Sequence, residues 1–385
     1  MTSATLAGQI AEMPFLDHHC HAPLKLPQQL PPEILRATFS ETTDRSVQQF
    51  DVPQTVAYRA MIRWLAALLG TAPNEAAVLA ARAALDPADY QRRLADDARL
   101  GPLFDDFLLQ PEECYSPEEW SQLTGRPVRT LLRIEVVAQQ LIPQAGSWEE
   151  LRRQFHQALS ESVGRGGVGF KSIAAYRCGL AIEPVDAAQA SAALAEVQAE
   201  LSAGAPNRLV NKTLIDALVW ETLEVAAQLG VPLQFHVGLG DDDVYLPTSN
   251  PTLMRSLFQE PRYRHVPIVL LHCYPYVEEA AYLASIYPNA YVDLGLTVPL
   301  AGSDCTAQIA TAFGLAPTNK LLASSDGHAV PEFQWFAAHL WRRALSRVLA
   351  EVVESDLLTV EQAIESAGLI LHGNAERIYP GQGEQ

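Results

Sequence analysis

The chain of 385 residues is 48% hydrophobic and 19% charged, which is typical of a globular protein with a large core. Its formal net charge of −18 comes from 45 acidic and 27 basic residues, and such a surface repels phosphate groups, so we expect no nucleic-acid or membrane partner. No apolar run approaches the roughly 20 residues of a membrane-spanning helix, and we expect no signal peptide. Five scattered cysteines without a CxxC pair predict a cytoplasmic location.

β-Rich segments recur along the chain with helical segments between them, which is typical of βα units and a parallel sheet. Several are almost continuous runs of Val, Ile and Leu, as in strands covered on both faces. We therefore predict an α/β fold of the (β/α)8 TIM-like barrel type. The eight predicted strands are residues 14–21, 102–110, 128–136, 167–175, 231–238, 266–274, 289–296 and 320–327.

The segment between the first two predicted strands has helical periodicity and no clear strand. A helical insertion after the first strand would lie at the C-terminal rim of a barrel, where active sites are built. We therefore predict one barrel domain over residues 1–385, with residues 25–100 inserted as a helical cap that shapes the pocket. The alternative is an insertion that packs away from the site.

Histidines gather where the predicted strands end. In the stretch FLDHHCHAP, His19 and His21 point to the same face of the first strand, because side chains alternate along a strand. That stretch alone fits a metal-binding pair or a polar turn equally well. However, His236, His272 and Asp326 end the fifth, sixth and eighth predicted strands. The carboxyl ends of barrel strands meet at one rim, so the set favours a divalent metal site.

This ordered set of an HxH pair, two further strand-end histidines and a strand-eight aspartate resembles the metal site of the amidohydrolase superfamily. The chain looks closest to its amidohydrolase 2 branch. It is especially similar to the amidohydrolase domain that fungi fuse to a glutamine-synthetase-like domain, and to its stand-alone bacterial relatives. The segments that carry this resemblance are LLRIE, GFKSIAAYRCGL, LLHCYPYVEEAAYLASIYPNAYVDLG, SSDGHAVPE and LHGNAERIYPG. It covers nearly the whole chain except the helical insertion.

The resemblance implies one divalent metal, most often zinc, with Mn²⁺ or Fe²⁺ as alternatives, bound by His19, His21, His236 and Asp326. Such an ion lowers the pKa of bound water from about 16 to near 7. Asp326 would accept the proton of that water and return it to the leaving group, while His272 would donate a hydrogen bond to the substrate carbonyl oxygen. As structural alternatives, Asp326 could cap the following helix and His272 could be a core histidine.

Four further residues are candidate substrate contacts. Lys171 lies on the fourth predicted strand, where some amidohydrolases carry a carboxylated lysine between two metals; we favour a charged group that fixes the substrate or a carboxylate such as Glu135. Arg177 is the better candidate for binding a substrate carboxylate, because its planar guanidinium binds bidentately. Arg133 could pair inside the barrel or contact the substrate. His328 could contact the substrate, support a ligand or begin a helix.

We expect an enzyme, a metal-dependent hydrolase of a C–N amide bond in a small carboxylate-bearing substrate. A γ-glutamyl amide follows only by analogy with domains beside glutamine-synthetase-like partners. The alternative is a decarboxylase or sugar-acid isomerase, because such relatives carry the same ligand framework. A barrel without catalysis that serves as a binding partner is the third interpretation, and the complete ligand set argues against it. The sequence indicates a small-molecule partner and leaves a homo-oligomer open.

Overall fold

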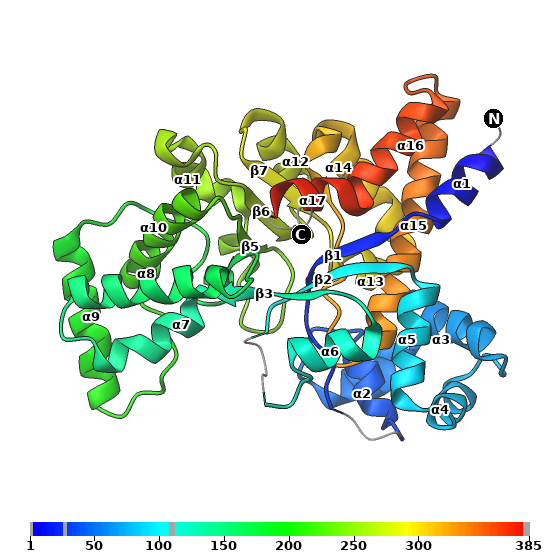
Figure 1. Cartoon of the computed structure of the whole chain (residues 1–385), viewed down its shortest axis with the longest axis horizontal. Coiled ribbons are helices and arrows are strands. Elements are labelled where there is room, and N and C mark those ends of the chain that lie inside the picture. The colour runs from blue at the N-terminus through cyan, green and yellow to red at the C-terminus, as the bar shows by residue number, and fades with distance from the viewer. Residues whose placement is uncertain (1–2, 26–28, 108–111, 380–385) are drawn as a thin grey trace. The chain divides into compact units, whose positions relative to one another are not determined.

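The computed structural model describes residues 3–25, 29–107 and 112–379, with strands that alternate with helices along the chain (Figure 1). Eight strands follow one another in the order β1 to β8, and this confirms the predicted (β/α)8 fold class. Their bounds are β1 (Phe15–Cys20), β2 (Leu100–Asp105), β3 (Val128–Arg133), β4 (Gly169–Ser172), β5 (Leu233–Val237), β6 (Ile268–His272), β7 (Ala290–Asp293) and β8 (Leu321–Leu322).

The chain forms two compact units, and the first contains residues 1–129, 294–314 and 321–375. Here β1 and β2 run parallel, with Phe15 opposite Leu100 and Cys20 opposite Asp105. The predicted helical insertion after the first strand is present, although its residues 26–28 lie outside the described part of the chain. Its α-helices are α2 (Pro32–Ala37), α3 (Val56–Leu69), α4 (Glu75–Ala83) and α5 (Pro87–Asp97).

The ends of the inserted helices follow from local chemistry. The Thr55 side chain accepts a hydrogen bond from the Tyr58 amide at the start of α3, and α3 ends at Gly70, whose φ of 68° suits glycine. Asp86 caps α5 in the same way as Thr55 caps α3. The other α-helices of this unit are α1 (Ser3–Ala11), α6 (Pro117–Thr124), α13 (Thr297–Ala301), α15 (Pro331–Glu354), α16 (Val360–Gly368) and most of α14 (Cys305–Leu315).

The second unit contains residues 130–293, 315–320 and 376–385, of which 380–385 lie outside the described residues. Its strands run parallel, and β5 and β6 are buried along their whole length, which explains their nearly continuous apolar sequences. Helices α8 and α10 pack against each other here (Figure 1). The α-helices are α7 (Ile134–Leu141), α8 (Trp148–Gly164), α9 (Ala187–Ser202), α10 (Lys212–Leu229), α11 (Arg255–Gln259), α12 (Val277–Ile286) and α17 (Asn374–Ile378), of which the last begins in the first unit.

Every strand that the structure describes is shorter than its predicted segment, and two differences concern candidate site residues. The third strand ends at Arg133, so Glu135 lies in the first turn of α7 rather than in a strand. The eighth strand comprises only Leu321–Leu322, so Asp326 lies in an irregular segment beyond it. For the second strand, the predicted residues 108–110 lie outside the described residues. No helix in the described ranges is both long and apolar enough to cross a membrane.

Candidate metal centre

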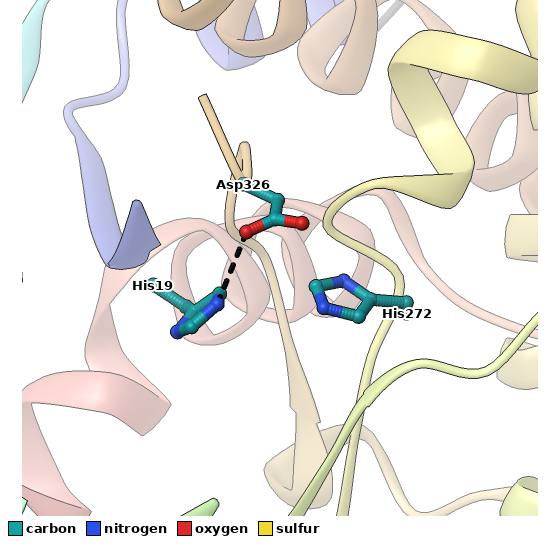
Figure 2. A group of neighbouring side chains, drawn as sticks. All are labelled: His19, His272 and Asp326. Atoms are coloured by element: carbon teal, nitrogen blue, oxygen red, sulfur yellow. Dashed lines mark ion pairs between the residues drawn. The ribbon is translucent and has the colours of Figure 1, made fainter. Parts of the chain in front are cut away.

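Three of the four predicted metal ligands come together in the first unit. Nε2 of His19 lies 3.0 Å from Oδ1 of Asp326 (Figure 2). Nε2 of His21 lies 3.3 Å from the same oxygen. All three side chains are buried. When zinc bonds are about 2.0–2.1 Å long in a tetrahedral site, neighbouring donor atoms are about 3.3 Å apart. The two separations therefore suit donors that share one cation.

Main-chain bonds fix Asp326 beside the end of β1. Its amide donates to the carbonyl of His19 over 3.0 Å, and the amide of His21 donates to the carbonyl of Gly327 over 2.7 Å. Asp326 has a φ of 50°, which is uncommon for residues other than glycine. Such strained residues persist only where surrounding contacts hold them, and they concentrate at functional sites.

Asp17 supplies part of that support, and sequence analysis missed it. Its buried carboxylate accepts hydrogen bonds from the amide of Ser325 over 2.9 Å and from the Ser325 hydroxyl. The same hydroxyl accepts a bond from the amide of Gly327 over 2.8 Å. Because strand side chains alternate, Asp17 shares its face with His19 and His21, and this spacing was a usable signal.

The tautomer of His21 follows from its neighbour. Nδ1 of His21 lies 3.2 Å from the main-chain oxygen of Asp106. A carbonyl oxygen only accepts, so Nδ1 carries the hydrogen and the lone pair of Nε2 faces Asp326. Metal-binding histidines are commonly oriented by such a second hydrogen bond. The donor set of this unit, two imidazoles and a carboxylate in a buried site, fits a divalent cation.

Two more carboxylates that sequence analysis did not consider lie at the end of β2. The donor atoms of His19, His21 and Asp106 all lie within 4.8 Å of one another, and all three residues are buried. The neighbouring Asp105 accepts a hydrogen bond from the Ala22 amide over 3.0 Å. Burial raises the pKa of Asp105 to about 7, although His21 and the Ala22 amide act in the opposite direction. In the sequence both aspartates lie in the middle of the predicted strand 102–110, and two acidic residues that interrupt an apolar strand were the available signal.

A cavity of about 140 Å³ opens beside these groups, and His21, Asp105, Asp106 and His328 line it. Nδ1 of His328 lies 3.2 Å from the main-chain oxygen of Asp326. Burial lowers the pKa of His328, against the opposing effect of the Asp326 charge, so the neutral imidazole is favoured. Helix α15 has its N-cap at Val330, without a side-chain cap. His328 therefore does not begin that helix, and Asp326 does not cap it.

The remaining predicted histidines lie side by side in the second unit. His236 and His272 are buried at the ends of β5 and β6, with ring centroids 4.7 Å apart. Nε2 of His236 lies 2.8 Å from the carbonyl oxygen of Leu239, which only accepts, so Nε2 carries the hydrogen and Nδ1 keeps its lone pair. His272 has a φ of 70°, a second strained position at a strand end.

The predicted basic residues also belong to the second unit. Lys171 lies opposite Arg133 in the register of β4 and β3, and both side chains are buried. Arg177 follows the 3₁₀ turn Ala174–Tyr176, and the Tyr176 ring packs against His236 with centroids 4.3 Å apart. Arg177 thus lies next in sequence to a residue that contacts a candidate ligand.

The Arg177 guanidinium has unused donors. Its Nε and Nη1 are buried without a hydrogen-bond partner among the described residues. Burial and, secondarily, Arg208 lower the pKa of Arg177 from its usual value.

Glu135 is fully buried and accepts hydrogen bonds from the Ser172 hydroxyl over 2.6 Å and from the Ile173 amide over 3.0 Å. Burial nevertheless raises the pKa of Glu135.

The C-terminal half of the chain matches a known protein family. Residues 206–381 match the amidohydrolase family model. These residues belong to the amidohydrolase family. The match includes the strand-end positions His236, His272 and Asp326, and the resemblance noted in the sequence is confirmed.

Two relatives cover almost the whole chain. Protein fluG of Emericella nidulans is 31% identical over 98% of this chain, and the chain spans 47% of the length of that protein. A solved structure from Lactobacillus casei ATCC 334, to which a metal-dependent hydrolase activity has been ascribed, has a TM-score of 0.87 at 28% identity and 97% coverage of both chains. The family match and the Lactobacillus casei structure together support an enzyme.

More distant structures share the fold alone. The uronate isomerase of Thermotoga maritima has a TM-score of 0.67 at 12% identity, with 98% of this chain and 97% of that chain covered. The glucuronate isomerase of Caulobacter crescentus has a TM-score of 0.68 at 14% identity, with 100% and 94% covered. At such identities the likeness concerns architecture and does not carry the reaction.

Proposed function

We propose that this protein is a metal-dependent hydrolase that cleaves a C–N amide bond in a small substrate bearing a carboxylate. The observation that carries the proposal is the buried arrangement in which the Nε2 atoms of His19 and His21 both lie beside one oxygen of Asp326. The similarity to a structure with an ascribed metal-dependent hydrolase activity supports it. All five cysteines are free thiols, which is consistent with the proposed cytoplasmic location.

His19, His21 and Asp326, with His236 as the fourth predicted ligand, would hold one divalent ion, with zinc as the first candidate. When bound, such an ion lowers the pKa of water and polarises a carbonyl group. Imidazole nitrogen and carboxylate oxygen are the donors that zinc takes in hydrolases, and three neutral imidazoles leave the site with a net positive charge.

The residues around the cation supply proton transfer and carbonyl binding. As the water oxygen bonds to the amide carbon, the carboxylate of Asp326 accepts a proton and delivers it to the leaving nitrogen while the C–N bond breaks. The products are a carboxylic acid and ammonia or an amine. His272 would donate a hydrogen bond to the carbonyl oxygen, where charge develops, and losing such a donor costs about 3–4 kcal/mol of transition-state stabilisation.

Arg177 is our candidate for the substrate carboxylate. Its buried Nε and Nη1 donors, which lack a partner among the described residues, match the two oxygens of a carboxylate. In support, Tyr176, which precedes Arg177 in sequence, packs against His236, a proposed ligand. Lys171, Arg133 and His328 are proposed as further substrate contacts, and a γ-glutamyl amide is the first substrate to test.

The test is product analysis with purified protein on a panel of γ-glutamyl amides and matched amides that lack the carboxylate. We expect release of ammonia or an amine, and faster turnover of the amides that carry the carboxylate. Carbon dioxide would indicate a decarboxylase, and a product of unchanged formula from a sugar acid would indicate an isomerase. Either result without amide cleavage would replace the proposed reaction.

Substitution of Arg177 tests the carboxylate contact separately. Each hydrogen bond between charged groups contributes about 1.5–3 kcal/mol, so Arg177→Met is expected to lower kcat/KM roughly 10²-fold or more. The loss should vanish for the amide without a carboxylate. Arg152→Met removes a guanidinium that pairs with Glu221 on the surface, and it serves as the charge-matched control. Equal losses on both substrates would contradict the role of Arg177.

A further inference from the structure

Asp106 lies directly after β2, beside His19 of β1 and His21, which follows β1. Its side chain is 1% exposed, and its donor atom lies within 4.8 Å of those of His19 and His21. We propose that Asp106 is a ligand of the same divalent cation as these two histidines, so that the second strand contributes to the centre. The inference rests on the proposed function, because it requires the cation.

The main chain holds Asp106 in register with the histidines. Its amide donates to the carbonyl of Cys20 over 2.9 Å, and its carbonyl accepts the hydrogen bond from Nδ1 of His21 over 3.2 Å. Cys20 lies between the two histidines in sequence. The main chain of Asp106 is therefore hydrogen-bonded both to the backbone between the two histidines and to the ring of His21.

The charge balance favours a ligand at this position. Asp106 and Asp326 bring two carboxylates to the same pair of imidazoles, and all four side chains are buried. Buried charges are costly unless they are paired or coordinate a metal. Coordination to one divalent cation would stabilise both carboxylates in this buried position. Carboxylate oxygen is also an established zinc ligand, with bonds of about 2.0–2.2 Å.

Asp105 provides a matched control within the same pair. It is equally buried, but one of its carboxylate oxygens accepts the Ala22 amide, and it is absent from the group of donors around His19 and His21. Replacing Asp105 or Asp106 by asparagine makes the same isosteric change in adjacent residues, and the comparison is made at pH 8, where Asp105 with its pKa of about 7 is mostly ionised. A difference between the two variants therefore reports coordination rather than the general field of a nearby carboxylate.

The experiment uses the full chain, stripped of metal by a chelator and titrated with Zn²⁺ in competition with an indicator, and with Co²⁺ followed by its visible absorption. Altered contacts next to metal ligands cost about 10–100-fold in affinity, so Asp106→Asn should weaken Zn²⁺ binding at least 10-fold. It should also change the Co²⁺ spectrum. Asp105→Asn should stay within about threefold of the wild type, with an unchanged spectrum.

The outcomes separate this inference from the proposed function. Asp106→Asn with wild-type affinity, or with an unaltered Co²⁺ spectrum, would overturn Asp106 as a ligand and leave the proposed function standing. A wild-type chain that binds no divalent metal would overturn both. Should Asp106→Asn fail to fold, Asp106→Glu keeps the carboxylate but displaces it by one methylene. Its Co²⁺ spectrum must then differ from that of the wild type, and an identical spectrum would refute the inference.

Discussion

The pairing of Asp17 with Ser325 gives a quantitative prediction about how the first unit holds Asp326. The Asp17 carboxylate accepts the amide of Ser325 over 2.9 Å and also the Ser325 hydroxyl, and both side chains are fully buried. Asp17→Ala leaves both donors without this acceptor. Asp17→Asn keeps one acceptor oxygen for the amide, and its new NH₂ group can donate to the hydroxyl oxygen.

The magnitudes follow from the number of bonds. A hydrogen bond to a charged group contributes about 1.5–3 kcal/mol, and an unsatisfied buried donor costs about 1–3 kcal/mol. We therefore expect Asp17→Ala to lower the free energy of unfolding by about 3–5 kcal/mol, and Asp17→Asn by about 1–2 kcal/mol. Because Ser325 precedes Asp326, both variants should also weaken metal binding.

A double-mutant cycle isolates the contact. The free energy of unfolding is measured by urea denaturation for the wild type, Asp17→Ala, Ser325→Ala and the double variant. Residues that share a hydrogen bond show coupling of about 0.5–3 kcal/mol, and we expect about 1–2 kcal/mol here. Coupling below about 0.3 kcal/mol, which is the range of independent sites, would refute the reasoning.

Three further predictions concern a glycine, a histidine and the metal. Gly238→Ala should destabilise the fold several times more than Gly230→Ala. Both glycines have a positive φ (76° and 67°), but of the two only Gly238 lies where an added Cβ would overlap the carbonyl oxygen of Tyr274. Equal losses of unfolding free energy in urea denaturation would contradict this prediction. Burial lowers the pKa of His339 in the folded state, so this group contributes stability that is present above about pH 6.5 and is lost as the pH falls. His339→Gln should therefore flatten the pH dependence of the unfolding free energy between about pH 7 and 5. Removal of metal by a chelator should lower Tm, because a ligand at 100 times its Kd stabilises by about 2.7 kcal/mol, and restored metal should reverse the shift.

The candidate ligands could be predicted because they depend on strand periodicity. His19 and His21 share a face through the two-residue repeat of a strand, and His236 and His272 end runs of buried apolar residues. Both features are local in sequence. The structure accordingly has His236 and His272 at the ends of β5 and β6, as expected.

The strand ends could not be predicted, because tertiary contacts decide them. Periodicity does not distinguish a short apolar strand from a buried helix, and the run LLRIEV changes from β3 to α7 after Arg133. Asp326 adopts its positive φ beyond β8 because Asp17 and His19, far away in sequence, bond to this segment. The contribution of Asp106 likewise depends on the pairing of β1 with β2.

Elemental analysis of the purified protein tests the central claim most directly, by the number of divalent ions bound per chain. We expect about one ion in the wild type and in the control Arg152→Met, and none in His19→Ala. Asp326→Asn should retain part of the metal and lose turnover. A wild-type chain that turns over amide substrate without bound metal, or a His19→Ala chain with full metal content, would contradict the account.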